Sequence, residues 1–513
     1  MRRNPDYLIV GSGLASLVFG SLAAKSGKVV HIIEAHEFAG GFGHTFEMAN
    51  KYKFNAQLHY VWNCGEGESV NQVLKKLNLE EDVKFNRYNP DGFDHMYIPG
   101  YSVKIPSDSD ELIRRLVSLF PDYEKNIVSF LREVNIVAKG LDNISYPINA
   151  SQIIKNLNPV ITTLSHLKKT LQQVFDQFHL PLEVQALLAS QWPDFLLPPD
   201  KLSFYAWVML FTGYQRGAYY PEKHFEHVID SLKKEIISNG GQFFFETEVT
   251  NFILEKRVMK GVKSRNLKTG QLNDHLGNTV ICNMDPQKAA RIIGIHKFSK
   301  KLQKRLNFEY SPSNFMAYCV VKDLDLRKFG FGEWNVFHSG HKNINEAYHN
   351  MYDNFDYSNP SFAITTPTLL TNKGGDCPPN HQIVELLTVA NYEHWKQLKI
   401  GDQRIYKNKK MEILDAMLDV VEKEYIPGFR NHMVFKMTGS PTTNERYCWC
   451  PQGNSYGSNI TPENIGPGRL NYKTSLKNFY FCNASSGFAG FAGTFWTGAT
   501  LYERLTGDKV LKK

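Results

Sequence analysis

The sequence predicts an α/β fold in which a Rossmann-type dinucleotide-binding domain is intertwined with an α+β domain. Three observations predict it. An apolar run, Tyr7–Val10, leads into a glycine-rich turn, a second apolar run ends in Glu34, and a glycine-rich stretch lies near the other end, at 478–505. At 513 residues the chain exceeds what one hydrophobic core usually supports, so we expect two domains.

The first strand and its turn form the nucleotide-binding pattern. Asp6–Val10 has the continuous apolar run of a buried parallel strand. The turn matches G-x-G-x-x-[G/A], with serine in the last small position. Its glycines allow a tight turn and a close pyrophosphate, and a helix over 14–26 points its N–H groups at the phosphates. We expect this turn to surround the phosphates with Gly11, Ser12, Gly13, Leu14, Ala15 and Ser16.

The second strand supplies an acidic residue. Val29–Ile33 is apolar and β-branched, and Glu34 closes it, 21 residues after Gly13. A carboxylate at this distance accepts hydrogen bonds from the adenosine ribose and would repel the 2′-phosphate of NADP. Ala35 follows and should also face the nucleotide.

Composition excludes several classes. The net charge of +8 is mild for this length and no dense basic block occurs, so no nucleic-acid binding is expected. The seven scattered cysteines predict neither disulfides nor a metal site, and Cys448 and Cys450 are interpreted as structural. The sequence shows no signal peptide and no apolar run of about 18 residues, so we expect a cytoplasmic protein, at most peripheral to a membrane.

A second glycine cluster, Gly40-Gly41 with Gly43 and His44, follows the acidic residue. This cluster resembles the loop of the FAD-dependent amine oxidase and phytoene desaturase superfamily, in which the backbone passes close to the flavin half of the cofactor. The resemblance implies FAD as the cofactor. An ordinary glycine turn is the alternative.

Three distant segments resemble the same superfamily. The strand end Thr247-Glu248-Val249 implies that Val249 meets the adenine, and TVICNMDP (279–286) implies a role for Asn283. The stretch 478–505 resembles the closing motif, with Asn483 near the ribityl chain. A helix starting near Gly493-Thr494 would direct its N-terminus at the flavin and stabilise negative charge there.

The closest resemblance is to the phytoene desaturase, carotenoid isomerase and retinol saturase group. The segment GGFGHTFEMANKYKFNAQLHYV (40–61) is similar to the saturase pattern, although Asn55 and Gln57 replace its usual Asp and Gly. Lys223 and His224 stand where the group usually has Gly-Gly. The resemblance implies a Rossmann-type FAD-binding (GR2-like) domain intertwined with an α+β substrate domain.

The expected division follows from these motifs. The FAD-binding domain should comprise 1–75, 225–290 and 472–513, and the substrate domain 76–224 and 291–471. The stretch 109–141 is helical by pattern, Phe315–Val321 and Gln382–Ala390 are strands, and 328–380 reads as long loops.

The implied function is an FAD-dependent oxidoreductase acting on C=C or CH–CH bonds of a hydrophobic polyene or isoprenoid lipid, by desaturation, saturation or isomerisation. The alternatives are a flavin amine oxidase and a non-enzymatic lipid-binding escort protein of the same fold. His59, with Tyr60 beside it, is the candidate acid/base residue; a structural histidine is the alternative.

The expected partner is a hydrophobic small-molecule substrate. Peripheral membrane contact through apolar residues in or near 150–215, helped by Lys168 and Lys169, would give access to such a molecule. No pattern in the sequence fixes an oligomeric state.

Overall fold

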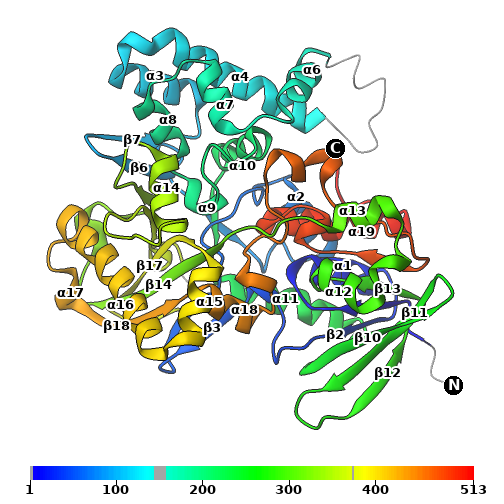
Figure 1. The fold of residues 1–513 in the computed structure, drawn as a ribbon. Helices are drawn as coiled ribbons and strands as arrows, with labels where there is room; N and C mark the ends of the chain where they lie inside the picture. Colours follow the sequence, from blue (N-terminus) through cyan, green and yellow to red (C-terminus); the bar gives the residue numbers. More distant parts are fainter. Residues whose placement is uncertain (1–3, 144–156, 372–374, 513) are drawn as a thin grey trace.

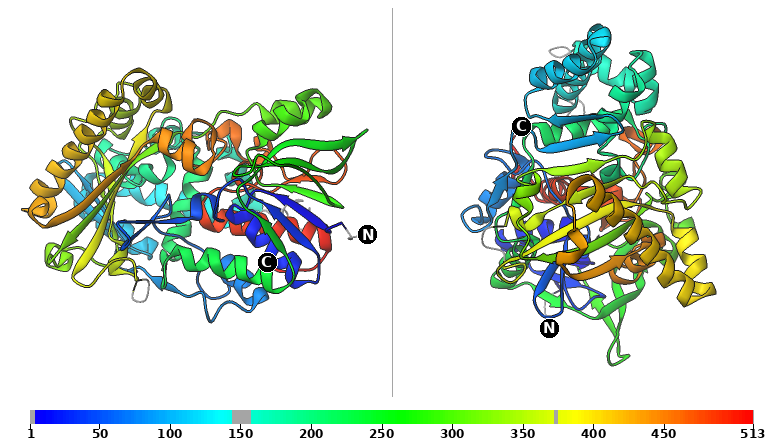
Figure 2. Two further views of the ribbon diagram at one scale, coloured as in Figure 1. Left: turned by 90° about the horizontal axis from the view of Figure 1, so that it is seen from below. Right: turned by 90° about the vertical axis from the view of Figure 1, so that its left-hand side faces the viewer.

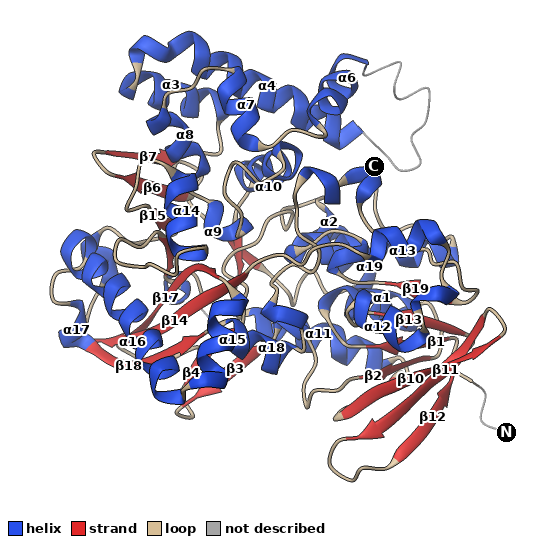
Figure 3. Cartoon of the chain, viewed as in Figure 1, coloured by secondary structure: helices blue, strands red, loops and turns tan. Residues whose placement is uncertain are grey.

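The structure is a computed structural model that describes residues 4–143, 157–371 and 375–512. Figures 1 and 3 show two regions joined along the chain. One holds the two chain ends and a parallel sheet, and the other holds a large mixed sheet with a layer of helices above it. Of the stretch expected to contact a membrane, in or near 150–215, residues 150–156 lie outside the described residues. Among the rest, no helix is long and apolar enough to cross a bilayer.

A five-stranded parallel sheet carries the dinucleotide pattern. Its order is β19-β13-β1-β2-β9. The strands come from chain segments far apart: β1 Tyr7–Val10, β2 Val30–Ile33, β9 Gln242–Phe244, β13 Thr279–Cys282 and β19 Phe479–Phe481. This sheet confirms the predicted α/β, Rossmann-like fold. Both predicted strands before and after the first helix are present.

Helices cover this sheet closely. They are α1 Leu14–Lys25, α2 Ser69–Leu77, α11 Phe225–Ser238, α12 Pro286–Ile293, α13 Lys300–Leu306 and α19 Gly490–Thr506. Helix α1 contacts both α11 and α19, and Figure 2 (left) shows the red C-terminal helix beside the blue N-terminal segment. A Cβ atom on Gly498 would overlap the carbonyl oxygen of Ala15. Glycine at this position therefore lets α19 approach α1.

An antiparallel sheet of three strands stands beside the parallel one. It contains β10 Thr247–Glu255, β11 Val258–Asn266 and β12 Leu272–Leu276. The sequence predicts the hairpin formed by the first two. Apolar side chains of β10 and β11, such as Phe252 and Val262, pack with Val280 and Phe479 of the parallel sheet.

The second region is built on a seven-stranded sheet of order β18-β14-β17-β16-β15-β6-β7. Only the β15–β6 pair is parallel. The strands are β6 Asp94–Ile98, β7 Tyr101–Ile105, β14 Ser313–Lys322, β15 Asn335–His338, β16 Phe362–Thr365, β17 His381–Ala390 and β18 Met433–Gly439. Two short antiparallel pairs join β3 Thr45–Met48 to β4 Tyr52–Asn55 and β5 Phe85–Arg87 to β8 Tyr219–Pro221.

Helices form the outer layers of this region. The upper group in Figure 3 comprises α3 Ser109–Leu119, α4 Glu124–Asn143, α6 Leu157–His166, α7 Leu171–Gln177, α8 Leu182–Ala189 and α10 Phe204–Arg216. The remaining helices are α9 Trp192–Phe195, α14 Ile344–Tyr352, α15 Tyr392–Gly401, α16 Gln403–Val420, α17 Phe429–His432 and α18 Pro441–Cys448. Both strands expected at 315–321 and 382–390 are present within β14 and β17.

The stretch 328–380 differs from its prediction as long loops, because it contains β15, α14 and β16. Its composition is rich in Asn, Gly and aromatics. The strands form because pairing with β6 and β17 in the same sheet outweighs weak local propensity.

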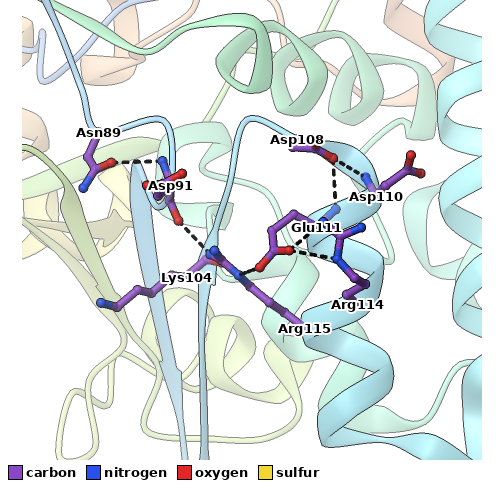
Figure 4. A network of polar contacts seen from close by, with 8 residues as sticks. All are labelled: Asn89, Asp91, Lys104, Asp108, Asp110, Glu111, Arg114 and Arg115. Atoms are coloured by element: carbon purple, nitrogen blue, oxygen red, sulfur yellow. Dashed lines mark hydrogen bonds and ion pairs between the residues drawn. The ribbon is translucent and has the colours of Figure 1, made fainter.

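A polar network fixes α3 to the β6–β7 hairpin (Figure 4). Asp108 caps α3 by accepting hydrogen bonds from the backbone N–H groups of Asp110 and Glu111. One guanidinium nitrogen of Arg115 donates to the carbonyl oxygens of Asp91 and Lys104, at 2.7 and 3.0 Å. Asp94, which opens β6, is thereby part of a firmly anchored hairpin.

Candidate functional site

A deep cavity opens at the carboxyl ends of β1, β2, β13 and β19. Ligands of open α/β sheets bind at this edge. The N-termini of α1 and α19 reach into it, and so does a loop from the second region. Of the predicted cofactor residues, the following line the cavity: Gly11, Ser12, Gly13, Leu14, Ala15, Glu34, Ala35, Gly40, Gly41, Gly43, Val249, Asn283, Asn483 and Thr494.

Glu34 is held by the turn that it faces. Its Oε2 accepts hydrogen bonds from the backbone N–H of Ser12 at 2.7 Å and from the Ser12 hydroxyl at 2.6 Å. Its Oε1 accepts from the backbone N–H of His36 at 2.8 Å. The carboxylate therefore lies fixed at the rim of the cavity, where it can accept further hydrogen bonds from a ribose.

Gly13 contacts Asn283 as well as the cavity. Its N–H donates to Asn283 Oδ1 at 3.0 Å, and a Cβ atom at this position would overlap that oxygen. The Asn283 amide in turn donates to the carbonyl oxygen of Cys482 at 2.5 Å. From the sequence, glycine is expected at position 13 because a pyrophosphate must approach the backbone there. The structure gives a second reason: Asn283 bonds to Gly13 and to Cys482, and so connects this turn to the end of β19.

Ser16 does not line the cavity. It is fully buried, and its hydroxyl shares one hydrogen between the carbonyl oxygens of Gly11 and Gly13, at 2.7 and 2.8 Å. Its side chain thus braces the turn from behind. The small residue expected here serves helix packing, and serine adds hydrogen bonds that glycine or alanine lacks.

The second glycine cluster lies against the first. The N–H of Gly40 donates to the carbonyl oxygen of Ser12 at 2.9 Å. Gly40 and Gly41 have φ values of 116° and 56°, which glycine adopts without strain. A Cβ atom on Gly41 would lie only 3.3 Å from the Cα atom of Gly13. Glycines in both loops therefore keep the cavity open between them.

His44 lies behind this cluster rather than in the cavity. It is buried, and its Nδ1 lies 2.6 Å from the carbonyl oxygen of Gly41. Burial lowers the pKa of His44 to about 4, so the neutral ring donates its Nδ1–H to Gly41 at neutral pH. The sequence suggests that His44 contacts the cofactor. In the structure His44 does not line the cavity, and it instead supports the loop that does.

Helix α19 begins at Gly490, three residues before the predicted start. Gly490, Phe491 and Thr494 line the cavity, but Gly493 does not. A Cβ atom on Gly493 would lie 2.8 Å from Cβ of Phe488, so this glycine serves packing of the first turn. Asn483 accepts the N–H of Ser486 at 3.0 Å and stabilises the loop before the helix.

A half-buried arginine, not predicted from the sequence, holds the same loop. Arg469 donates to the carbonyl oxygens of Ala484, at 2.6 Å, and Gly487. Burial lowers its pKa to about 10, which still leaves it charged at neutral pH. Its positive charge lies behind the cavity wall formed by Ala484 and Ser485.

A loop of the second region also lines the cavity, which the sequence does not predict. Its clue in the sequence is CWCPQGNSYG (448–457), a short stretch that combines glycine, asparagine and aromatic residues. It contributes Cys448, Trp449, Cys450, Pro451, Asn454, Ser455, Tyr456 and Gly457 to the cavity wall. Further unpredicted lining residues are Phe42, Gln57, Leu58, Thr247, Glu248, Met284, Asp285, Pro286 and Lys288.

The two candidate catalytic residues do not line this cavity. His59 is 8% exposed, and its Nδ1 lies 3.4 Å from Glu385 Oε2. Within the described part of the chain, neither ring nitrogen has a hydrogen-bond partner. The Tyr60 hydroxyl lies 3.0 Å from both Asp94 Oδ2 and Asp194 Oδ2. Both residues follow Gln57 and Leu58, which do line the cavity.

The arrangement fits a dinucleotide. Two helix N-termini supply unpaired N–H groups and positive dipole ends, which suit phosphate and an anionic ring. The glycine clusters leave the wall free of side chains, and Glu34 suits a ribose. Among the described residues, no group of acidic, His and Cys side chains could hold a metal ion.

Comparisons with known proteins agree with this geometry. A family profile described as an NAD(P)-binding Rossmann-like domain matches residues 9–77. The chain is 23% identical to the all-trans-retinol 13,14-reductase of Danio rerio over 96% of its own length and 84% of that protein. It is 22% identical to the chloroplastic prolycopene isomerase of Arabidopsis thaliana over 99% of its own length and 84% of that protein.

Solved structures share the fold. Wild-type putrescine oxidase bound to putrescine superposes with a TM-score of 0.63 at 11% identity, covering 99% of this chain and all of that one. RAB GDI from Plasmodium falciparum superposes with a TM-score of 0.53 at 12% identity, covering 99% of each chain. The chain is thus similar throughout its length to retinol 13,14-reductases and prolycopene isomerases, which confirms the resemblance that its glycine motifs predict.

Proposed function

We propose that the chain is an FAD-dependent oxidoreductase that acts on C=C or CH–CH bonds of a hydrophobic polyene, of carotenoid or retinoid type. The observation that carries the proposal is a glycine-lined dinucleotide cavity in a chain similar, over nearly all its length, to enzymes named for polyene reduction and isomerisation. When bound, the flavin would supply or accept the hydride.

Different residues of the cavity would bind different parts of the cofactor. Glu34 would accept hydrogen bonds from the adenosine ribose. The turn 11–16 and the first turn of α1 would bind the pyrophosphate, and Gly40 and Gly41 would lie along the flavin half. The first turn of α19, with Thr494, would face the ring and favour negative charge on it.

The loop 448–457 of the second region would close the cavity from the other side. Because it follows α18 of the mixed-sheet region and lines the cavity, it would bring the proposed substrate region against the cofactor. Gln57 is fixed at this boundary by the amides of Asn314 and Asn444, at 2.7–3.1 Å. A long apolar substrate would enter here from the mixed-sheet region.

The test is anaerobic mixing of the yellow, FAD-loaded protein with candidate substrates. A polyene that is desaturated should bleach the absorption of the oxidised flavin. A polyene that is saturated should restore the colour of chemically reduced enzyme, and an isomerised one should change geometry with no lasting change of colour. Lack of all three responses with carotenoids and retinoids would contradict the proposal.

The second candidate function is that of a flavin amine oxidase, because putrescine oxidase shares the fold. Bleaching by primary or secondary amines, without any response to polyenes, would favour it. A chain that takes up no flavin would favour the third class, a lipid-binding escort protein, whose fold is represented by RAB GDI.

A further inference from the structure

A cluster of buried ionisable groups lies beside the cavity and outside its wall. Tyr60 follows β4, Asp94 opens β6, and Asp194 stands in α9. Asp94 is fully buried, Tyr60 is 5% exposed, and Asp194 is half-buried. The Tyr60 hydroxyl lies 3.0 Å from one oxygen of each carboxyl group.

The hydrogens of this cluster can be counted. The phenol has one hydrogen to donate and two carboxyl groups to reach. Gln191 donates N–H to Asp94 Oδ2 at 2.5 Å and to the Tyr60 oxygen at 3.0 Å, but it supplies no hydrogen between Tyr60 and Asp194. Both contacts of the phenol are hydrogen bonds only when one carboxyl group is protonated. The phenol then accepts from that acid and donates to the other carboxylate.

Two arrangements satisfy this rule, and they differ by a shift of two hydrogens along the chain Asp94–Tyr60–Asp194. In one, Asp94 is the acid and Asp194 the carboxylate. In the other, Asp194 is the acid. Burial, followed by the charge of Asp194, raises the pKa of Asp94 well above its usual range, and burial raises that of Asp194 to about 7. Both directions agree with the one shared proton that the two contacts of the phenol require.

The Asp194 end of the chain is half-buried and lies next to a residue of the cavity wall. The carbonyl oxygen of Asp194 accepts a hydrogen bond from the hydroxyl of Tyr456, which lines the cavity. The other end is fixed inside the mixed sheet, where Asn335, the register partner of Asp94, lies 3.4 Å from its second oxygen. Asp94 is thus the fully buried end of the chain and Asp194 its half-buried end.

A second observation concerns His59, the residue before Tyr60. This imidazole is more than nine-tenths buried, yet neither of its nitrogens has a hydrogen-bond partner among the described residues. Nδ1 has Glu385 Oε2 at ion-pair distance, 3.4 Å, whereas Nε2 has no such neighbour among the described residues, and this leaves Nε2 open to a further polar partner. The imidazole is close enough to Asp194 for its charge to lower the pKa of that carboxyl group.

We propose that Asp194 is the residue that exchanges a proton with the polyene, and that Tyr60 and Asp94 act as a relay that supplies this proton. The inference rests on the proposed function. In saturation, the two hydrogens would shift so that Asp194 carries the shared proton; one carbon of the C=C bond would take a hydride from the flavin, and its neighbour would take the proton of Asp194. After product release, solvent would return one proton through Asp194, the half-buried end of the chain, and the reverse shift would store it at Asp94. Desaturation runs in the opposite direction.

The first test needs no substrate. Infrared spectra of the FAD-loaded protein at a pH of about 8, far above the ordinary pKa of Asp of about 3.9, should show a protonated carboxyl C=O band. The band should disappear in Asp94→Asn and remain in Asp194→Asn and in Asp122→Asn, which alters an exposed carboxyl group. FAD content and circular dichroism establish that each variant folds. A wild-type spectrum without the band, or a band unaffected by Asp94→Asn, would overturn the relay.

The second test uses single turnover with a reactive polyene. Asp194→Asn should slow the chemical step by about 10²–10⁴-fold with FAD retained, and Asp194→Glu should restore part of the rate. Tyr60→Phe should slow the first turnover as well as later ones because it interrupts the relay, whereas Tyr214→Phe, which keeps the ring stacked 3.9 Å from Tyr60, should not. Wild-type rates in Asp194→Asn would overturn the assignment.

The ionisable groups that face this cluster are His59, Tyr88, Tyr214, Glu385 and Tyr456. If no polyene reacts at all, the proposed function fails, while the infrared spectra still decide whether the two carboxyl groups share a proton.

Discussion

Gly13 lies in the glycine-rich turn, lines the cavity and donates a hydrogen bond to Asn283, which follows β13. Replacement by alanine should place Cβ against Asn283 Oδ1 and break the hydrogen bond between them. We expect a loss of about 1–3 kcal/mol of unfolding free energy and most of the bound FAD. Thermal unfolding and flavin absorbance after gel filtration measure both. Gly401→Ala, at a position with open space around it, should change neither.

His44 makes the stability depend on pH. Its pKa is about 4 in the folded chain and about 6.5 when unfolded, so between these values the unfolded chain binds more protons. The unfolding free energy should therefore fall as the pH drops from about 6.5 to 4. His44→Gln, which can still donate to Gly41, should flatten this slope by up to about 1.4 kcal/mol per pH unit.

The control for this prediction is His296→Gln, because His296 is exposed. Chemical denaturation at a series of pH values gives the slopes. An unchanged slope in His44→Gln would show that this imidazole is not the buried neutral group described above.

Among the elements, α1 and α19 determine the shape of the cavity, because both of their N-termini reach it. Gly498→Ala should force α19 away from α1, since Cβ would overlap the carbonyl oxygen of Ala15. We expect a loss of about 1–3 kcal/mol and a faster release of FAD. Thr500→Ala, on the same helix, should stay within about 0.5 kcal/mol of wild type. Equal FAD release in both variants would contradict the role given to Gly498.

The elements also differ in how well the sequence predicts them. Contiguous motifs, such as the strand, turn and helix over 7–25 and the hairpin after 247, were predictable because their periodicity and glycine positions are local. The loop 448–457 was not, since only the mixed sheet brings it to the cavity. Asp94 and Asp194 could not be predicted as site residues for the same reason. Nothing in the local sequence distinguishes them from other aspartates, and only the fold places each of them 3.0 Å from the Tyr60 hydroxyl.

For the whole molecule, a water-insoluble substrate implies contact with a lipid surface. Helix α6 exposes Ile161 and Leu164, 54% and 52% exposed, close in sequence to Lys168 and Lys169. The protein should float with anionic liposomes at low salt, and the double change Ile161→Ser and Leu164→Ser should weaken this binding. Leu272→Ser, which removes a 73% exposed leucine on the antiparallel sheet, should not. Failure of wild type to float at any salt concentration would contradict the prediction.

The proposed function depends most on the cavity between the two glycine clusters, and whether this cavity binds FAD tests it most directly. The purified chain, reconstituted with FAD and freed of unbound cofactor, should carry one FAD per chain, identified after release by denaturation. The Glu34→Gln variant should hold it more weakly because the ribose loses a charged acceptor. A wild-type chain that stays colourless after reconstitution would contradict the account.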